Sequence, residues 1–369
     1  MIEGLMQALS PGYFFYLTLG VLIGMFVGTL PGLTATMGTA LLVPFTFALP
    51  TGEGIAMLGG LYVCAMFSDS IPACLVNTPG TPAAMATAFD GHPMVQQGRG
   101  QEAIVASCFS STIGTVFGAG CYLVLAWPLI EIALKFGPPE FFWLGIFALT
   151  IIGSLAGDSI LKGLAGGAIG LLISCVGISH GNELARFTFG VPELRGGVSL
   201  VAGLIGIFAI PQVLSMVTEL RKKEFIAEYK PKGGETFKTI RKVIAHPLHL
   251  LRSSAIGSFI GILPGAGSPI AAIVSYNEAV RWSKDKSQYG KGDLRGVTAS
   301  EIANNAAAPA AMIPLVTLGV PGSSPAAVIA GALMLRGLNP GPELFQSDGA
   351  LVYSFGWALL FAGIVTFIL

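Results

Sequence analysis

Four Pro-Gly pairs interrupt long apolar runs of this sequence, in the stretches GTLPG, NTPGT, ILPGAG and GVPGSS. Proline removes a backbone donor and glycine weakens a helix, so each pair should break a helix. The half-helix that follows presents free N–H groups at its positive dipole end, which favours an anion, whereas the carbonyls that end the preceding half favour a cation. Kinks that serve only packing are the alternative. We predict that these breaks bind an anionic substrate through the following residues: Pro31, Gly32, Thr34, Asn77, Thr78, Pro79, Gly80, Thr81, Gly265, Ala266, Gly267, Pro321, Gly322, Ser323 and Ser324.

A second polar island lies in ASEIANNAAAP, residues 299–309. Asn304 and Asn305 cannot both face lipid without cost, because a buried amide needs hydrogen-bond partners. They are candidates to bind sodium or to donate hydrogen bonds to a substrate carboxylate, and hydrogen bonds that only join helices are the alternative. We expect Glu301 to lie at the cytoplasmic mouth in contact with water.

Asp69, in FSDSIPA, is a carboxylate well inside an apolar segment. An ionisable residue at such a depth is a candidate proton acceptor or cation ligand. Together with Ser68 and the pair Asn304 and Asn305, it forms our prediction for ion coupling, by sodium or by a proton. A bound sodium would lie at the hairpin tips, and we expect no structural metal and no other cofactor. A purely structural hydrogen bond from Ser68 or Ser70 to Asp69 is the alternative.

Side chains for hydrolytic or redox chemistry do not gather in this sequence. The four histidines are dispersed, and the five cysteines lie singly in apolar segments without CxxC spacing. The zinc motif HExxH and the phosphate-binding motif GxxxxGK[ST] do not occur. We therefore expect a protein that is not an enzyme.

The composition is that of a membrane protein. Only 11% of the 369 residues are charged and 53% are hydrophobic, whereas a soluble domain has about 25% charged residues. Most side chains should therefore face lipid or other membrane segments, which predicts an all-α polytopic protein. Lys and Arg are concentrated in two stretches, nine in 219–252 and five in 281–295. Both stretches should lie in the cytoplasm, because short basic loops stay there, and we expect no binding of nucleic acid.

One of the broken stretches occurs twice. IGMFVGTLPG (residues 23–32) and IGSFIGILPG (residues 256–265) are identical at seven of ten positions. IPACLVNTPGTPAA and IPLVTLGVPGSSPAA follow them in the same order. Two matches in one order indicate an internal duplication. Each copy of the first stretch also has glycines at every fourth position, a spacing that lets helices approach closely in lipid.

The second copy lies between the two basic stretches, so residues 253–280 should enter and leave the membrane on one side. Each crossing needs about 20 helical residues, so we predict a re-entrant hairpin here, with its tip near mid-membrane. An odd number of crossings would place the first hairpin, residues 13–49, on the opposite side, which gives inverted repeats, as in secondary transporters. Between the hairpins we predict five crossings: 54–88 (broken near Pro79), 103–127, 141–157, 161–178 and 198–218.

These elements predict three parts of the chain: a first repeat (1–218), a basic cytoplasmic connector (219–252) and a second repeat (253–369). After its hairpin, the second repeat has a broken helix at 299–335 and one helix at 351–369. In the first repeat, several more helices follow the break. Symmetry therefore predicts further helices, on the order of 100 residues, and we expect the chain to be truncated.

Three stretches resemble the large membrane subunit of tripartite tricarboxylate transporters, the TctA family. They are GTLPGLTATMG, LVNTPGTPAAMATAFDGHPM and GVTASEIANNAAAPAAMIPLVTLGVPGSSPAAVIAGALMLRGLNPGPELF, and the resemblance runs from about Gly12 to the last residue. It implies a multi-pass carrier of the bacterial inner membrane for citrate-like carboxylates, coupled to a cation. It also implies a small membrane subunit and a periplasmic binding protein as partners, and related carriers imply elevator-type movement. The stretch MFSDSI departs from an expected pattern such as YGGSI, and its extra carboxylate would alter the coupling ion or the substrate.

We therefore predict a secondary transporter subunit that binds a carboxylate between two hairpin tips and two broken helices. No arginine lies in the predicted tips. Backbone N–H groups, hydroxyls and a bound cation should therefore replace the water around the anion. The alternative function is an anion or ion channel with re-entrant pore loops, which would show a continuous polar pore lining.

Overall fold

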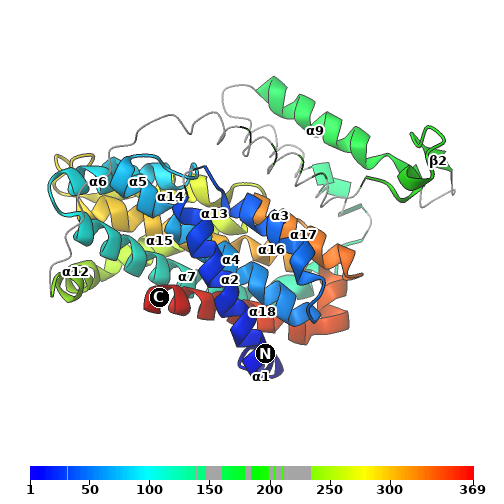
Figure 1. Ribbon diagram of the computed structural model, residues 1–369, viewed down its shortest axis with the longest axis horizontal. Coiled ribbons are helices and arrows are strands. Elements are labelled where there is room, and N and C mark those ends of the chain that lie inside the picture. Colours follow the sequence, from blue (N-terminus) through cyan, green and yellow to red (C-terminus); the bar gives the residue numbers. More distant parts are fainter. Residues whose placement is uncertain are drawn as a thin grey trace.

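A computed structural model of the protein describes residues 1–30, 32–137, 139–140, 142–143, 145–146, 160–178, 184–198, 203, 206, 210, 214 and 234–369. These residues are mostly helical, and the helices pack into an elongated bundle (Figure 1). Four of the described helices are long and apolar enough to cross a membrane: Pro11–Thr29, Thr51–Val76, Gly100–Ala133 and Pro342–Ile368. The fold is that of an all-α membrane protein.

The first half of the chain begins with a helical hairpin, which turns at the predicted tip. Gly32 has a φ of 87°, in the left-handed region that glycine adopts most readily, and Pro31 lies outside the described residues. The Oγ1 of Thr34 accepts a hydrogen bond of 3.2 Å from the N–H of Met37, and such a cap contributes about 1 kcal/mol. The helices up to this point are α1 (Ile2–Ala8), α2 (Pro11–Thr29) and α3 (Ala35–Thr46).

The next span consists of α4 (Thr51–Ser68) and α5 (Ser70–Val76), with Asp69 between them in a right-handed helical conformation. Pro72 explains the boundary between α4 and α5, because proline has no N–H to donate to the carbonyl of Ser68. The span ends at Asn77, whose φ of 55° is left-handed, and a loop that contains Pro79 follows. The helices after this loop are α6 (Ala84–Gln96) and α7 (Gly100–Ala133).

The second half of the chain has the same order of elements. A hairpin is followed by a nearly continuous span that ends at Gly319, whose φ is 74°. The Oγ of Ser323 then caps the next helix by accepting a hydrogen bond of 3.3 Å from the N–H of Ala326. The helices are α12 (Glu235–Ile244), α13 (Pro247–Ile262), α14 (Gly267–Trp282), α15 (Leu294–Ala310), α16 (Met312–Leu318), α17 (Ser324–Leu335) and α18 (Pro342–Ile368).

The lengths of the hairpin helices differ between the two halves. The helices α13 and α14 have 16 residues each, or about 24 Å at 1.5 Å per residue, which is short of the roughly 30 Å of a bilayer core. In the first hairpin, α3 has 12 residues, but α2 has 19 and is long enough to cross. A re-entrant geometry is therefore easier to reconcile with the second hairpin than with the first.

Glycines bring the hairpin helices close to the central spans. A Cβ on Gly24 of α2 would lie 2.5 Å from the carbonyl oxygen of Leu61 on α4. A Cβ on Gly257 of α13 would lie 2.5 Å from the carbonyl oxygen of Ala303 on α15. Neither site leaves room for a side chain, and the two glycines occupy the same position in the duplicated stretches. The two helix pairs are therefore packed through the same contact.

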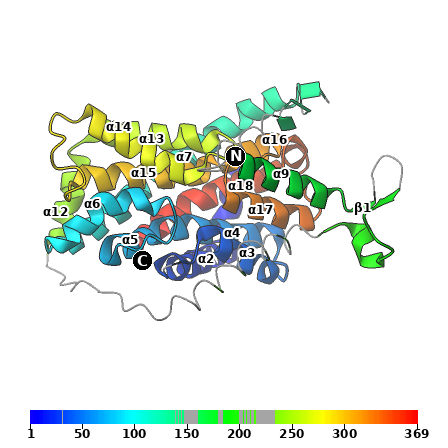
Figure 2. The ribbon, with the colours of Figure 1, turned by 90° about the horizontal axis from the view of Figure 1, so that it is seen from above.

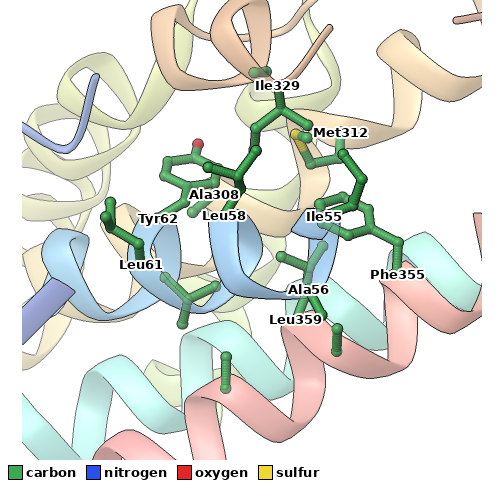
Figure 3. Close-up of a cluster of buried hydrophobic side chains, with 14 of the residues drawn as sticks. Ile55, Ala56, Leu58, Leu61, Tyr62, Ala308, Met312, Ile329, Phe355 and Leu359 are labelled. Atoms are coloured by element: carbon green, nitrogen blue, oxygen red, sulfur yellow. The ribbon is translucent and has the colours of Figure 1, made fainter. Parts of the chain in front are cut away.

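Helices α4 and α15 lie at the centre of the bundle. Helix α4 packs against α2, α3 and α18. Helix α15 packs against α7, α13 and α14, and Figure 2 shows α13, α14 and α15 side by side. In Figure 3, Ile55 and Leu58 of α4 are surrounded by Met312, Ile329 and Phe355, which come from α16, α17 and α18. Both central helices are nearly completely buried. Protein rather than lipid therefore surrounds α15, which explains why it tolerates polar residues.

A segment apart from the bundle contains α9 (Ile160–Ser174), a short pair of antiparallel strands, β1 (Gly177–Ile178) and β2 (Ala185–Arg186), and the 3₁₀ helix η1 (Pro192–Gly196) (Figure 1). Helix α9 coincides with the predicted crossing 161–178, but its 15 residues cover only about 22 Å. Three predicted segments lie largely outside the described residues: the crossings 141–157 and 198–218, and residues 219–233 of the connector.

Candidate substrate and cation site

The first hairpin tip and the first helix break meet at Asp69. The hydroxyl of Thr81 donates a hydrogen bond to Oδ2 of Asp69. A Cβ on Gly80 would lie 3.6 Å from the Cβ of Asp69 and 3.7 Å from the carbonyl oxygen of Leu33, which follows Gly32. The loop after α5 therefore touches both the hairpin tip and the carboxylate.

The alternative of a purely structural hydrogen bond from Ser68 or Ser70 to Asp69 is wrong, because both serines bond other groups. The Oγ of Ser68 lies 2.7 Å from the carbonyl oxygen of Cys64 and 3.1 Å from that of Gly24. The Oγ of Ser70 lies 2.6 Å from that of Ser107 on α7. Both serines therefore join helices, and Thr81, twelve residues further along the chain, bonds the carboxylate instead.

The second hairpin tip and the second break meet in a similar way. The N–H of Gly322 donates to the carbonyl oxygen of Ala311 at 3.1 Å, and a Cβ on Gly322 would lie 2.8 Å from the carbonyl oxygen of Gly261. A Cβ on Gly267 would lie 3.9 Å from the Cβ of Ser323. At the second junction, Gly322 leaves no room for a side chain, whereas a Cβ on Gly80 at the first junction would make only ordinary van der Waals contacts.

Helix α4 links the first half of the chain to the second junction. The hydroxyls of Tyr62 and Ser323 are 3.0 Å apart and share a hydrogen bond. The side chain of Asn304 donates from Nδ2 to the carbonyl oxygen of Met66 at 2.9 Å. Because Met66 precedes Asp69 by about one helical turn, Asn304 lies along α4 close to the first junction.

The expectation that Glu301 lies at a solvated mouth is wrong, because its side chain is completely buried. Its carboxylate accepts hydrogen bonds from the hydroxyl of Thr87 on α6 and from that of Ser111 on α7, the latter at 2.8 Å. The Nδ2 of Asn305 lies 2.9 Å from the Oγ of Ser111 and 3.3 Å from Oε2 of Glu301. Helices α6 and α7 cover α15 here, and their hydroxyls take the place of water.

Asn304 and Asn305 thus belong to different environments. Consecutive residues point about 100° apart on a helix, so Asn304 faces α4 and the first junction, whereas Asn305 faces the carboxylate of Glu301. The sequence predicted that the pair acts together, but only Asn304 is placed beside the residues of a helix break.

Several buried oxygens in this region have no hydrogen-bond partner among the described residues. They are Oδ1 of Asp69, Oγ1 of Thr78, Oδ1 of Asn304 and Oδ1 of Asn305. A buried polar atom without a partner costs about 1–3 kcal/mol. Within the described part of the chain, neither Asp69 nor Glu301 forms an ion pair with Lys or Arg. Buried oxygens without a partner are suited to bind a sodium ion, and buried carboxylates without a cationic partner are suited to bind a proton.

The other predicted residues lie at the edges of the two junctions. Asn77 and Pro79 line an open pocket of about 320 Å³ together with Phe89 and His92. Ser324, the first residue of α17, is exposed. In the second tip, Gly265 and Gly267 have φ values of 76° and 64°, on either side of Ala266, and Pro321 immediately precedes Gly322.

Sequence reasoning missed Tyr62 and misplaced Glu301. The spacing of Glu301 and Asn305 puts both on one helix face, and this i, i+4 relation was a usable sign of a shared polar environment. Tyr62 gave no such sign, because its partner Ser323 lies 261 residues further along the chain.

Residues for hydrolytic chemistry do not gather in the described part of the chain. No group of three or more His, Cys, Asp or Glu there could hold a metal ion. The stretch GISHG at 177–181 has the spacing GxSxG, but a two-residue strand begins it instead of the strand–turn–helix context of a nucleophile. Its Ser179 and His180 lie outside the described residues, so it carries no argument for catalysis.

The protein has apolar helices long enough to cross a bilayer, and its helix breaks are packed inside the protein. These two features define a helical membrane protein in which broken helices line polar sites. The sequence profile of the tripartite tricarboxylate transporter TctA family matches residues 14–369, and the chain belongs to this family. The family consists of transporter components rather than enzymes. The chain is therefore a tripartite tricarboxylate transporter subunit.

Two curated proteins of Agrobacterium vitis are similar to the chain. The "Uncharacterized 52.8 kDa protein in TAR-I ttuC' 3'region" is 35% identical over 355 residues, which make up 95% of this chain and 69% of that protein. The "Uncharacterized protein in TAR-II ttuC' 3'region" is 43% identical over 97 residues, 26% of this chain and 40% of that protein. No solved structure matches the chain.

Proposed function

We propose that this protein is the large membrane subunit of a cation-coupled secondary transporter that imports tricarboxylates or related carboxylates. The observation that carries the proposal is the junction at Asp69, where a buried carboxylate without a cationic partner among the described residues lies between a hairpin tip and a helix break. A transporter that binds an anion and a cation at mid-membrane needs this combination of groups.

The substrate would bind at the two junctions through neutral donors. The loops after α5 and α16 supply backbone N–H groups and the hydroxyls of Thr81, Ser323 and Ser324. The described residues of these loops and of the hairpin tips include no arginine or lysine. Charge neutralisation of a carboxylate would therefore depend on the coupling cation.

The coupling cation would be sodium or a proton held near Asp69 and Asn304. The unpartnered oxygens Oδ1 of Asp69 and Oδ1 of Asn304 support sodium, because both are oxygen ligands already freed of water. The complete burial of Glu301, without a cationic partner among the described residues, supports a second position for a proton. Ser68 and Asn305 remain candidates for binding the coupling cation. Ser68 donates a hydrogen bond to the backbone carbonyl of Cys64, and Asn305 donates one to the carboxylate of Glu301.

The two halves would form inverted repeats that move in an elevator manner. The common order of elements and the common contacts at Gly24 and Gly257 support the duplication. The protein would lie in the bacterial inner membrane, with the basic residues of 234–252 and 281–295 in the cytoplasm. A small membrane subunit and a periplasmic binding protein that delivers the carboxylate would complete the system.

The test is uptake into proteoliposomes that contain the protein and its small subunit. Labelled citrate and a panel of dicarboxylates are offered with and without a binding protein and a sodium gradient. We expect saturable uptake that requires a sodium or proton gradient. Flux that saturates poorly and does not depend on a sodium or proton gradient would indicate the alternative, a channel with re-entrant loops.

Asp69→Asn and Asp285→Asn form a matched pair for the coupling step. Asp285 lies in an exposed loop, where it accepts hydrogen bonds from Ser287 at 2.9 and 2.7 Å. Asp69→Asn should change the sodium or pH dependence of uptake, and Asp285→Asn should leave it as in the unmodified protein. If uptake by both variants depends on sodium and pH in the same way, Asp69 has only a structural role.

A further inference from the structure

A basic pocket opens where the second hairpin meets the start of α15. Its volume of about 490 Å³ falls within the range of about 300–1,000 Å³ that small-molecule sites occupy. The walls come from the start of α13, the end of α14 with the residues that follow it, and the start of α15. Among the described residues, no carboxylate lines the pocket, and its polar and aromatic residues include His246, Arg252, Trp282, Lys284 and Arg295.

The positive charge of this pocket is not fully compensated. Arg295 forms an ion pair of 2.6 Å with Asp293, so it contributes little net charge. Arg252 and Lys284 form no ion pair within the described part of the chain. Two cationic side chains are therefore available to an anion that enters the pocket.

Arg252 is held in place but keeps a donor unused. Its guanidinium lies over the ring of Trp282, 5.8 Å from the centroid, and its Nη2 lies 3.3 Å from Nδ1 of His249. Its Nε is buried and has no hydrogen-bond partner among the described residues. The guanidinium is therefore fixed at the wall of the pocket, and a fixed guanidinium is suited to a phosphate because an arginine offers a planar set of N–H groups.

An exposed apolar face of α13 begins at the same pocket. Leu248, which lines the pocket, is 81% exposed, and Leu251 and Phe259 further along α13 are 56% and 67% exposed. Their spacing places them on one side of the helix, opposite the glycines that pack against α15. The pocket is therefore continuous with a surface that suits hydrocarbon.

We propose that the pocket binds an anionic phospholipid. The phosphate lies beside Arg252 and Lys284, and an acyl chain lies along Leu248, Leu251 and Phe259. The cationic side chains select an anion, and the apolar face of α13 selects a lipid over a free phosphate. The surrounding basic segments are those expected on the cytoplasmic side, where anionic headgroups bind basic pockets between membrane helices.

The test uses the full chain purified in detergent. Phosphatidylglycerol, phosphatidylcholine with the same acyl chains, and sodium phosphate are titrated separately, and bound lipid is counted by native mass spectrometry. We expect saturable binding of phosphatidylglycerol and at least tenfold weaker binding of phosphatidylcholine. Sodium phosphate should not displace the lipid at millimolar concentration.

Matched variants separate the pocket from general surface charge. Arg252→Gln should weaken binding of phosphatidylglycerol about tenfold, the loss expected for one charge-assisted hydrogen bond. Arg281→Gln is the control, because Arg281 pairs with Glu278 at 3.2 Å and does not line the pocket. It should change the affinity less than twofold. Leu248→Ser, which keeps every charge, should also weaken binding.

Three outcomes would overturn the proposal. An equal loss in Arg252→Gln and Arg281→Gln would show a diffuse response to surface charge. Equal binding of phosphatidylcholine would show that the headgroup is not recognised. Displacement by inorganic phosphate, with no effect of Leu248→Ser, would show a site for a free anion. Thermal unfolding of each variant without added lipid checks that Arg252→Gln is folded.

Discussion

Gly257→Ala should destabilise the protein through a clash between α13 and α15. The new Cβ would lie 2.5 Å from the carbonyl oxygen of Ala303 and 2.6 Å from its Cα, whereas uncrowded carbon contacts are about 3.5–4.0 Å. Both neighbours belong to the backbone of a buried helix, so the two helices must separate. Overpacking of this kind costs about 1–3 kcal/mol, and the better helix propensity of alanine returns up to about 1 kcal/mol.

We expect a net loss of about 1–2 kcal/mol in the free energy of unfolding, which for a chain of 369 residues corresponds to a decrease in Tm of roughly 1–3 °C. The assay is thermal unfolding of the purified protein in detergent, followed by the reaction of a thiol-sensitive dye with the buried Cys64 and Cys74. These thiols become accessible only when the helices around them separate.

Gly120→Ala is the matched control, because Gly120 lies in α7 and a Cβ there would meet nothing within 4 Å. Its Tm should stay the same or rise slightly. Gly24→Ala should lose as much stability as Gly257→Ala, since both meet a carbonyl oxygen at 2.5 Å. Equal Tm values for Gly257→Ala and Gly120→Ala would refute the packing argument, and a neutral Gly24→Ala would refute the equivalence of the two halves.

Three further predictions concern the junctions and the buried Glu301. Gly265→Val should abolish uptake while the protein still inserts, whereas Gly337→Val, which has the same φ of 76° but lies outside the two junctions, should retain uptake. Glu301→Ala should lower the free energy of unfolding by about 2–4 kcal/mol, because it leaves a cavity and unpaired hydroxyls, and Glu301→Gln should lower it less in the same thermal assay. A double-mutant cycle of Tyr62→Phe and Ser323→Ala should give a coupling of about 0.5–1.5 kcal/mol in the free energy of unfolding, and zero coupling would show that their hydrogen bond does not stabilise the fold.

Local chemistry explains what the sequence could predict of this fold. A Pro-Gly pair acts within a few residues, so the positions of both helix breaks and both hairpin turns follow from the chain itself. The glycines at Gly24 and Gly257 follow from the duplicated stretches, and they mark close helix contacts for the same local reason. None of these inferences required knowledge of which helices are neighbours.

The candidate site was harder to predict, because its partners come from distant parts of the chain. The burial of Glu301 depends on α6 and α7 covering α15, and the low hydropathy of 299–305 was compatible with a solvated mouth as well. The contact of Asn304 with Met66 spans 238 residues. A sequence shows that these groups are polar in an apolar region, but only tertiary packing decides which groups they bond.

The distribution of charge gives a physical reason for the cation coupling that we propose. For an assumed separation of about 8 Å, an ionised Asp69 would oppose each charge of a bound carboxylate by about 2 kcal/mol at an effective dielectric constant of 20, or roughly 30-fold in affinity. With no arginine or lysine among the described residues of the junctions, a sodium ion or a proton on Asp69 is the available way to remove that repulsion. Linkage is reciprocal, so citrate should raise the affinity for the cation by the same factor by which the cation raises the affinity for citrate. Equilibrium binding of citrate that does not depend on sodium or pH would show that Asp69 lies too far from the substrate to act in this way.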